Sequence, residues 1–278
     1  MNDLKQKHNL LISEVFNRAA DQYGSVGPNY FRYFGNKIVE YAGINRGQVV
    51  LDVACGRGAS IFPAHDRIGI SGKVIGIDLA RDMLKNIKLE IEDSSFDNIE
   101  LQEMDAEVLT FASNTFDVVL CGFGLFYLPD LEKALGEIKR VLKPGGIFVT
   151  STFGERDKRW APFRELIVST QKNLEPISLV QTKILDSKDE ITLYFKEAGF
   201  EKINIFQEEK EIYYKDETDW WQTMWSQGYR GFLERLNEQT LNEFKDESFK
   251  IISNIRTEHG IPENFSVLIT KAIKTNIT

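Results

Sequence analysis

Residues 51–60 read LDVACGRGAS, in which an apolar segment runs directly into a loop with two glycines one residue apart. A strand that ends in such a loop is typical of sites for nucleotide-like ligands, because glycine lets the backbone approach the ligand closely. Asp52 stands just ahead of Gly56 and Gly58, where its carboxylate would repel a phosphate. The stretch therefore predicts an α/β fold with a ligand site at the end of this strand, and Asp52 raises the question of which ligand is bound.

Strand-like and helix-like segments alternate from about residue 47 to residue 153. The strand-like segments are apolar and β-branched almost throughout, as expected for parallel strands that are buried on both faces. Repeated strand-helix-strand units predict a doubly wound sheet with right-handed crossovers. The expected strands are 49–53, 73–78, 99–104, 116–121 and 147–152, with helices such as 80–91 and 131–142 between them.

The rest of the chain completes a single domain in this interpretation. Residues 1–46 are polar and helix-prone, and we expect them to form an N-terminal helical cover over the cofactor-binding core, 47–153. Two stretches, 156–186 and 215–260, are interpreted as helical cap insertions on the same sheet, because neither has a strand set of its own. The further elements expected are a helix at 190–198 and closing strands at 202–206 and 265–273.

The composition of the 278-residue chain disfavours several classes of partner. There are 34 Lys and Arg against 42 Asp and Glu, a net charge of −8, which disfavours nucleic acid. The longest apolar run, 118–128, is too short to span a membrane, and the N-terminus lacks the apolar core of a signal peptide. The two cysteines, Cys55 and Cys121, suit a reducing, cytoplasmic location. We expect no metal site, since no further ligand-type residue lies near them and the three histidines fall in no motif.

Two classes of cofactor compete for the glycine loop. A dinucleotide site has glycines at loop positions one, three and six, but the sixth position here is Ile61. A phosphate-free, cationic nucleoside suits Asp52 better, and S-adenosylmethionine (SAM), with its sulfonium and ammonium groups, is such a ligand. Asp78 ends the second predicted strand, where its carboxylate can accept both ribose hydroxyls of either cofactor.

Five motifs, in this order and spacing, resemble those of class I SAM-dependent methyltransferases. They are VLDVACGRGAS (50–60), VIGIDLARDML (74–84), MDAEVLTF (104–111), FDVVLCGFGLFYLPD (116–130) and IKRVLKPGGIFVTS (138–151). The chain is most similar to the branch with the ubiquinone and menaquinone biosynthesis enzymes and many natural-product methyltransferases. The resemblance is strong over 47–153 and weaker over AADQYG (19–24). It implies a Rossmann-like sheet of about seven strands in the order 3-2-1-4-5-7-6, with the site at the carboxyl ends of the strands.

The resemblance also implies which residues bind the cofactor. Those around the methionine part are Asp52, Ala54, Gly56 and Gly58. Those around the ribose and adenine are Asp78, Leu79, Met83, Asp105 and Ala106. Those beside the sulfonium are Cys121, Gly122 and Phe123, and Tyr23 closes over the methionine end of the cofactor. Arg57 departs from the family pattern, and we expect this bulky cation to point to solvent, away from a cationic cofactor.

The expected reaction is methyl transfer from SAM to a small, apolar or aromatic molecule, driven mainly by alignment and desolvation. All four tryptophans lie in the cap insertions; about half should pack the cap onto the sheet and the rest should line an acceptor pocket. The predicted lining residues are Phe126, Tyr127, Trp160, Trp225 and Tyr229. The sequence leaves open whether O, N or C is methylated and assigns no catalytic base. An NAD-dependent oxidoreductase and a non-catalytic SAM-binding protein are the alternatives.

Overall fold

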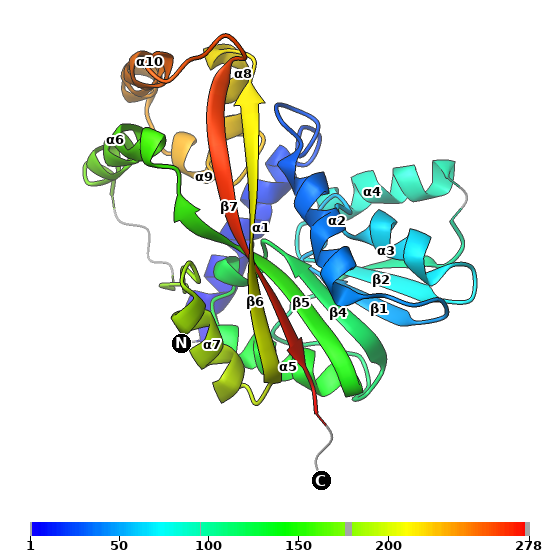
Figure 1. The fold of residues 1–278 in the computed structure, drawn as a ribbon. Coiled ribbons are helices and arrows are strands. Elements are labelled where there is room, and N and C mark those ends of the chain that lie inside the picture. Colours follow the sequence, from blue (N-terminus) through cyan, green and yellow to red (C-terminus); the bar gives the residue numbers. More distant parts are fainter. Residues whose placement is uncertain (1, 95, 176–179, 276–278) are drawn as a thin grey trace.

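The computed structural model describes residues 2–94, 96–175 and 180–275. One sheet of seven strands runs through the described chain in the order β3-β2-β1-β4-β5-β7-β6, as the resemblance implies (Figure 1). Strands β1 to β5 are parallel, whereas β7 pairs antiparallel with both β5 and β6. The strands are β1 (Val49–Val53), β2 (Lys73–Asp78), β3 (Ile99–Glu103), β4 (Phe116–Gly122), β5 (Leu142–Arg156), β6 (Glu201–Tyr214) and β7 (Ile261–Ile273).

Helices cover both faces of the sheet, because its central strands are apolar on both sides. On one face, α2 packs against β4, β5 and β7, α3 packs against β1 and β2, and α4 packs against β2 and β3. On the other face, α5 contacts β5 and α7 contacts β6. The bounds are α2 (Tyr30–Ala42), α3 (Ile61–Ile68), α4 (Arg81–Asp93), α5 (Leu131–Val141) and α7 (Lys188–Glu197).

The two closing strands form a hairpin that is much longer than predicted. Pairing between β6 and β7 continues from Glu201 opposite Ile273 to Tyr214 opposite Ile261, whereas β5 pairs with β7 only as far as Phe265. The far half of the hairpin therefore rises beyond the carboxyl edge of the sheet (Figure 1). The predicted ends at 206 and 265 were wrong, because residues 207–211 (QEEKE) form a continuous polar run and residues 261–264 (IPEN) contain a proline, so neither stretch has a strand-like apolar pattern.

Helices gather around the far half of this hairpin (Figure 1). Between its strands the chain forms α8 (Glu217–Trp225), α9 (Arg230–Leu233) and α10 (Glu238–Ser253), and α6 (Ala161–Gln171) packs against α10. We call α6, α8, α9 and α10 the cap helices. The segment 156–186 is less helical than expected, since its described part outside β5 holds only α6 and a short 3-10 turn (Lys158–Trp160). Residues 176–179 of that prediction lie outside the described chain.

The N-terminal helix α1 (Asn2–Ala19) lies against α4 and α9. It therefore joins the cap helices to the parallel part of the sheet. Three hydrogen bonds or ion pairs anchor it near the ends of β3 and β4: Lys5 with Asp130, His8 with the carbonyl of Tyr127, and Asn9 with Asp105. No helix among the described residues is long and apolar enough to cross a membrane.

Candidate active site

Three cavities meet at the carboxyl ends of the parallel strands, the edge at which such sheets bind ligands. One of about 110 Å³ lies beside the end of β2 and is called the β2 cavity. A second, of about 500 Å³, lies against residues 54–60 and is called the loop cavity. A third, of about 460 Å³, is lined by residues of α6, α8 and α9 and is called the cap cavity. Tyr23 and Phe123 line all three, so the cavities converge at these two rings.

The carboxylate of Asp78 lies in the wall of the β2 cavity. Its two oxygens accept hydrogen bonds of 2.8 Å from the backbone amides of Gly56 and Ala80. Each oxygen keeps a second lone pair for a ligand hydroxyl. Burial raises the pKa of Asp78, while the backbone hydrogen bonds oppose that shift. Asp78 is the one charged residue among the described residues that line this cavity, so a phosphate placed there would meet no cation.

The remaining walls of the β2 cavity are apolar. Leu79 and Met83 line it from the start of α4, and Ala106 lines it from the loop after β3. Asp105, predicted at the adenine edge, is not among the lining residues. Its two oxygens accept hydrogen bonds from the Asn9 side chain at 3.0 Å and from the Glu107 backbone at 2.8 Å. The structure thus uses the Asp105 carboxylate to anchor α1 and to shape its own turn.

Helix α1 forms a wall of the β2 cavity that the sequence prediction did not include. The lining residues from this helix are Asn9, Ile12, Ser13 and Phe16. Phe16 also reaches the cap cavity and meets Tyr23 and Tyr127 edge to face, with ring centroids 6.0 and 5.2 Å apart. The apolar spacing of Leu11, Ile12, Val15 and Phe16 was a signal of a packed helix face, but it did not show that this face covers a ligand site.

The glycine loop approaches its cavity with unusual backbone conformations. Gly56 and Gly58 have φ angles of 51° and 78°, and Ala54 has 53° although it carries a side chain. A Cβ on Gly56 would have only the Tyr23 ring, 3.9 Å away, within contact distance, so it would project into the space facing that ring. Phe123, on the opposite side, has a φ of 54°. Such strain in non-glycine residues is concentrated at ligand sites in many proteins, and both Ala54 and Phe123 line the loop cavity here.

Asp52 is completely buried beneath the loop and lines none of the three cavities. Its Oδ2 accepts a 2.5 Å hydrogen bond from the hydroxyl of Ser60, whereas its Oδ1 has no partner among the described residues. Burial raises the pKa of Asp52 to about 7, against the effect of the Ser60 hydrogen bond, and the charge of Asp78 adds to the rise. A buried carboxylate oxygen without a donor is costly, so the site fits a cationic ligand that would stabilise the ionised form.

The residues at the end of β4 are divided between the core and the cavities. Gly122 lines the β2 and loop cavities next to Phe123. Cys121 is fully buried in the core and lines none of them, and burial raises the pKa of its thiol to about 12. Both Cys121 and Cys55 are free, buried thiols. No group of three or more potential metal ligands occurs within the described ranges.

Arg57 does not point to solvent, and that prediction was wrong. Its guanidinium donates a 2.8 Å hydrogen bond to the carbonyl of Ala20 and pairs with the carboxylate of Glu90 on α4. Its side chain is only 21% exposed. The cation therefore holds the segment around Tyr23 against the glycine loop, and its charge is balanced by Glu90.

The cap cavity is lined largely by aromatic rings. Of the predicted residues, Phe126, Tyr127, Trp160 and Tyr229 line it, but Trp225 does not. On α8 the lining residues are Trp220, Thr223 and Met224, which share one helical face. Trp225 instead packs beside Trp221 and under the guanidinium of Arg230, 5.7 Å from the ring centroid. The tryptophan that faces the cavity from α8 is thus Trp220, one helical turn before Met224.

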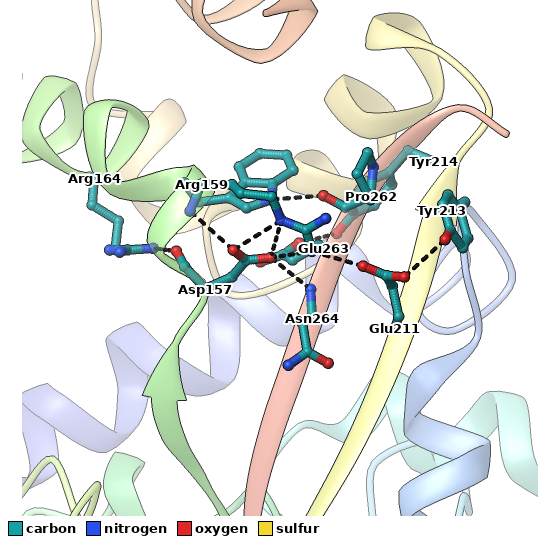
Figure 2. A network of polar contacts seen from close by, with 10 residues as sticks. Asp157, Arg159, Arg164, Glu211, Tyr213, Tyr214, Pro262, Glu263 and Asn264 are labelled. Atoms are coloured by element: carbon teal, nitrogen blue, oxygen red, sulfur yellow. Dashed lines mark hydrogen bonds and ion pairs between the residues drawn. The ribbon is translucent and has the colours of Figure 1, made fainter. Parts of the chain in front are cut away.

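A polar network, shown in Figure 2, contributes residues to the lining of the cap cavity. Asp157 pairs with Arg159, accepts a 2.8 Å hydrogen bond from the Asn264 amide, and offers its own carbonyl to Arg164 at 2.9 Å. On the hairpin, the Tyr214 hydroxyl donates a 2.7 Å hydrogen bond to Glu263. Burial raises the pKa of Glu263 to about 7, opposed by that hydrogen bond. The lining therefore combines aromatic rings with a polar part that contains Asp157, Arg164 and Glu263, which is called the polar end of the cap cavity.

Comparisons with known proteins agree with this arrangement. The profile of the ubiE/COQ5 methyltransferase family matches residues 1–159. The aklanonic acid methyltransferase DauC of Streptomyces sp. (strain C5) is 34% identical over 135 residues, which cover 49% of this chain and 61% of that enzyme. The demethylmenaquinone methyltransferase of Lactococcus lactis subsp. lactis (strain IL1403) is 31% identical over 207 residues, 68% of this chain and 81% of that enzyme. The crystal structure of the YcgJ protein from Bacillus subtilis has the same fold, with a TM-score of 0.59 at 18% identity over 88% of this chain and 99% of that chain.

Proposed function

We propose an arrangement of the cofactor and the methyl acceptor in this chain, which belongs to the ubiE/COQ5 methyltransferase family. The protein is a SAM-dependent methyltransferase that acts on a small molecule. In our assignment the adenine and ribose of SAM occupy the β2 cavity and the methionine part occupies the loop cavity. The acceptor occupies the cap cavity, and the three meet between Tyr23 and Phe123.

The shared position of Tyr23 and Phe123 is the observation that carries this assignment. Because both rings line all three cavities, a group that sits between them borders the cofactor and the acceptor at once. The cofactor supplies a methyl group on a sulfonium, which is already a good leaving group. The chain therefore needs mainly to align the acceptor atom at roughly 3–3.5 Å and to exclude water, and the aromatic rings of the cap cavity suit that task.

The acidic residues have separate roles in this proposal. Asp78 accepts the ribose hydroxyls, Leu79 and Met83 enclose the adenine, and the Ala106 backbone meets the adenine edge. Asp52 lies beneath the loop, where its ionised form favours a cationic ligand. Asp105 positions α1 rather than contacting the adenine, since it does not line the β2 cavity and its carboxylate accepts hydrogen bonds from the Asn9 side chain and the Glu107 backbone.

The nature of the acceptor and the setting of the enzyme are also part of the proposal. The aromatic lining supports a small, apolar or aromatic acceptor, whether it is methylated at O, N or C. The net charge of −8 disfavours a nucleic acid substrate. Two free, buried thiols suit a reducing compartment, and we propose the cytoplasm. The cap helices share one hydrophobic cluster with the sheet, which supports a single domain.

Calorimetry with SAM on two variants tests the cofactor assignment. We expect Asp78→Ala to weaken SAM binding by about 1–3 kcal/mol, because the ribose hydroxyls lose their acceptor. Asp82→Ala, an exposed carboxylate four residues further along the chain, is the matched control and should bind like the wild type. Unchanged affinity in Asp78→Ala, or tighter binding of NAD than of SAM by the wild type, would contradict the assignment.

A further inference from the structure

We propose that the methyl acceptor carries an oxyanion, and that Arg156 and Arg164 bind this group at the polar end of the cap cavity. The inference rests on the proposed function, since it takes the cap cavity as the acceptor site. Both arginines line that cavity, Arg156 from the end of β5 and Arg164 from α6.

Aromatic stacking sets the distance between the two ends of the cavity. The guanidinium of Arg156 lies over the ring of Phe153, 4.6 Å from its centroid. Phe153 in turn stacks on Phe123, with centroids 4.7 Å apart. One ring, that of Phe153, thus separates the cation from Phe123, which borders the cofactor cavities. An acceptor with a flat body of one or two rings can therefore present its methyl-accepting atom near Phe123 and an anion near Arg156.

The ion pairs of this region leave the two arginines without a carboxylate partner. Asp157 and Glu211 both pair with Arg159, and Glu155 pairs with Lys158. In the described part of the chain, no carboxylate oxygen lies within 4.0 Å of the guanidinium of Arg156 or Arg164. Arg164 is held in place by its hydrogen bond to the carbonyl of Asp157, which Figure 2 shows reaching toward the network. Arg156 is exposed and rests on Phe153, whereas Arg164 is partly buried. Two guanidiniums without a carboxylate partner suit an oxyanion, which each can bind through two parallel hydrogen bonds.

The nearest acid on the hairpin does not neutralise these arginines. Glu263 lines the same cavity, and its hydrogen-bond partner is the Tyr214 hydroxyl. Burial raises the pKa of Glu263 to about 7, although Arg156 and Arg164 lower it. At neutral pH this group is therefore partly protonated and can itself donate a hydrogen bond to an oxyanion. A protonated amine would face two arginines here and the sulfonium at the other end, so a cationic acceptor is disfavoured.

Three probes with the same ring system test the inference. 2-Naphthoate carries a planar anion, 2-naphthalenesulfonate carries a tetrahedral one, and 2-naphthamide carries no charge. Each is titrated by calorimetry into the wild-type protein, with and without saturating S-adenosylhomocysteine. We expect at least one anion to bind about tenfold or more tightly than the amide. Comparing the two anions distinguishes a carboxylate from a sulfonate- or phosphate-like group.

A double variant and a control variant show whether the arginines are responsible for the preference. Arg156→Gln with Arg164→Gln should abolish the preference for the anion while S-adenosylhomocysteine still binds, which also shows that the variant is folded. Lys158→Gln removes the same charge from a nearby side chain that is 89% exposed, and it should keep the preference.

Equal binding of the three probes, binding of none, or a preference that survives in the double variant would overturn the inference. Failure of S-adenosylhomocysteine to bind the wild type would instead contradict the proposed function. In that case, the titrations of the three probes without S-adenosylhomocysteine still show whether the cap cavity binds anions more tightly than the amide.

Discussion

The guanidinium of Arg57 donates a hydrogen bond of 2.8 Å to the carbonyl of Ala20, so the glycine loop holds the N-terminal segment directly. Tyr23, three residues later, stacks on Phe31 with centroids 4.7 Å apart and borders all three cavities. A cation in the loop would be expected to oppose a cationic cofactor. Here it pairs with Glu90 instead and keeps the cover of the site in place.

Arg57→Ala should loosen this cover. We expect SAM affinity to fall by about 1–3 kcal/mol, because the Ala20 carbonyl loses a charged donor. Hydrogen exchange of the amides of residues 19–26 should become faster in the absence of ligand. Arg81→Ala removes an arginine that is 76% exposed on α4 and is the control for a general loss of charge. Equal exchange rates in Arg57→Ala and wild type would show that the hydrogen bond does not restrain the segment.

Asp52→Asn should make the protein more stable but a poorer binder of SAM. The folded-state pKa of Asp52 is raised from its ordinary 3.8 to about 7. The preference of the folded state for protonated Asp52 therefore adds to the free energy of unfolding in full below pH 3.8, and this contribution is lost as the pH rises through 7. The amide of the variant does not titrate. Relative to the variant, the wild-type free energy of unfolding should therefore fall by up to about 1.4 kcal/mol per pH unit in that window.

A cationic ligand should favour ionised Asp52, so wild-type affinity for SAM should rise between about pH 6 and pH 8. The Asp52→Asn variant should lack this rise. Chemical denaturation and calorimetry over the same pH range measure both effects, and parallel pH profiles of the two proteins would rule out the proposed role of Asp52.

Glu263→Gln isolates the titration at the polar end of the cap cavity. The pKa of Glu263 is raised from 4.5 to about 7, so its stabilising contribution is present below pH 4.5 and is lost as the pH rises through 7. A Gln side chain keeps an acceptor for the Tyr214 hydroxyl and does not ionise. We expect similar melting temperatures near pH 5 and a variant that melts about 2–4 °C higher at pH 8. Thermal scans at the two pH values suffice, and an equal difference at both would refute the assigned titration.

Gly124→Ala and Gly136→Ala form a matched pair. A Cβ on Gly124 would lie 2.7 Å from the Ala54 Cβ and 2.8 Å from the Cys121 sulfur, whereas a Cβ on Gly136 meets nothing within 4 Å. We expect Gly124→Ala to destabilise the protein by about 1–3 kcal/mol and to weaken SAM binding, because Ala54 must shift. Gly136→Ala lies within helix α5 and should stabilise the protein by up to about 1 kcal/mol. Denaturant titrations that rank the two variants in the opposite order would contradict this packing.

Most of the parallel strands could be predicted from the sequence because β1, β2, β4 and the 147–152 part of β5 are short, mainly apolar runs, whereas β3 (IELQE) alternates apolar and polar residues. Their order and the placement of β7 before β6 required the resemblance, since a pattern of strands does not state which strand lies beside which. The length of the β6–β7 hairpin could not be predicted. Beyond Phe206 its strands pair increasingly with each other rather than with the core, and Glu208 and Lys210 look like loop residues.

The directions of individual side chains were harder to predict than the elements. Asp52, Asp105 and Cys121 lie at the expected strand ends but turn into the core or toward α1. Trp225 lies on the expected helix, but the phase of α8 directs Trp220 to the cavity. A one-residue difference in helical phase rotates a side chain by about 100°. Sequence alone therefore identifies the carboxyl edge of the sheet as the site and leaves the choice between neighbouring residues to the packing.

The β6–β7 hairpin pairs with the sheet at one end and supplies Tyr214 and Glu263 to the cap cavity at the other. The two ends are joined by continuous strand pairing from Asn204 to Tyr214, while the residues that border the β2 cavity lie on other elements. Chimeras that exchange residues 211–264 with the corresponding part of a relative should then change the acceptor preference while every residue that lines the β2 cavity is retained. Such a division would allow substitutions in the hairpin and the cap helices to change the acceptor while the residues that bind SAM stay the same.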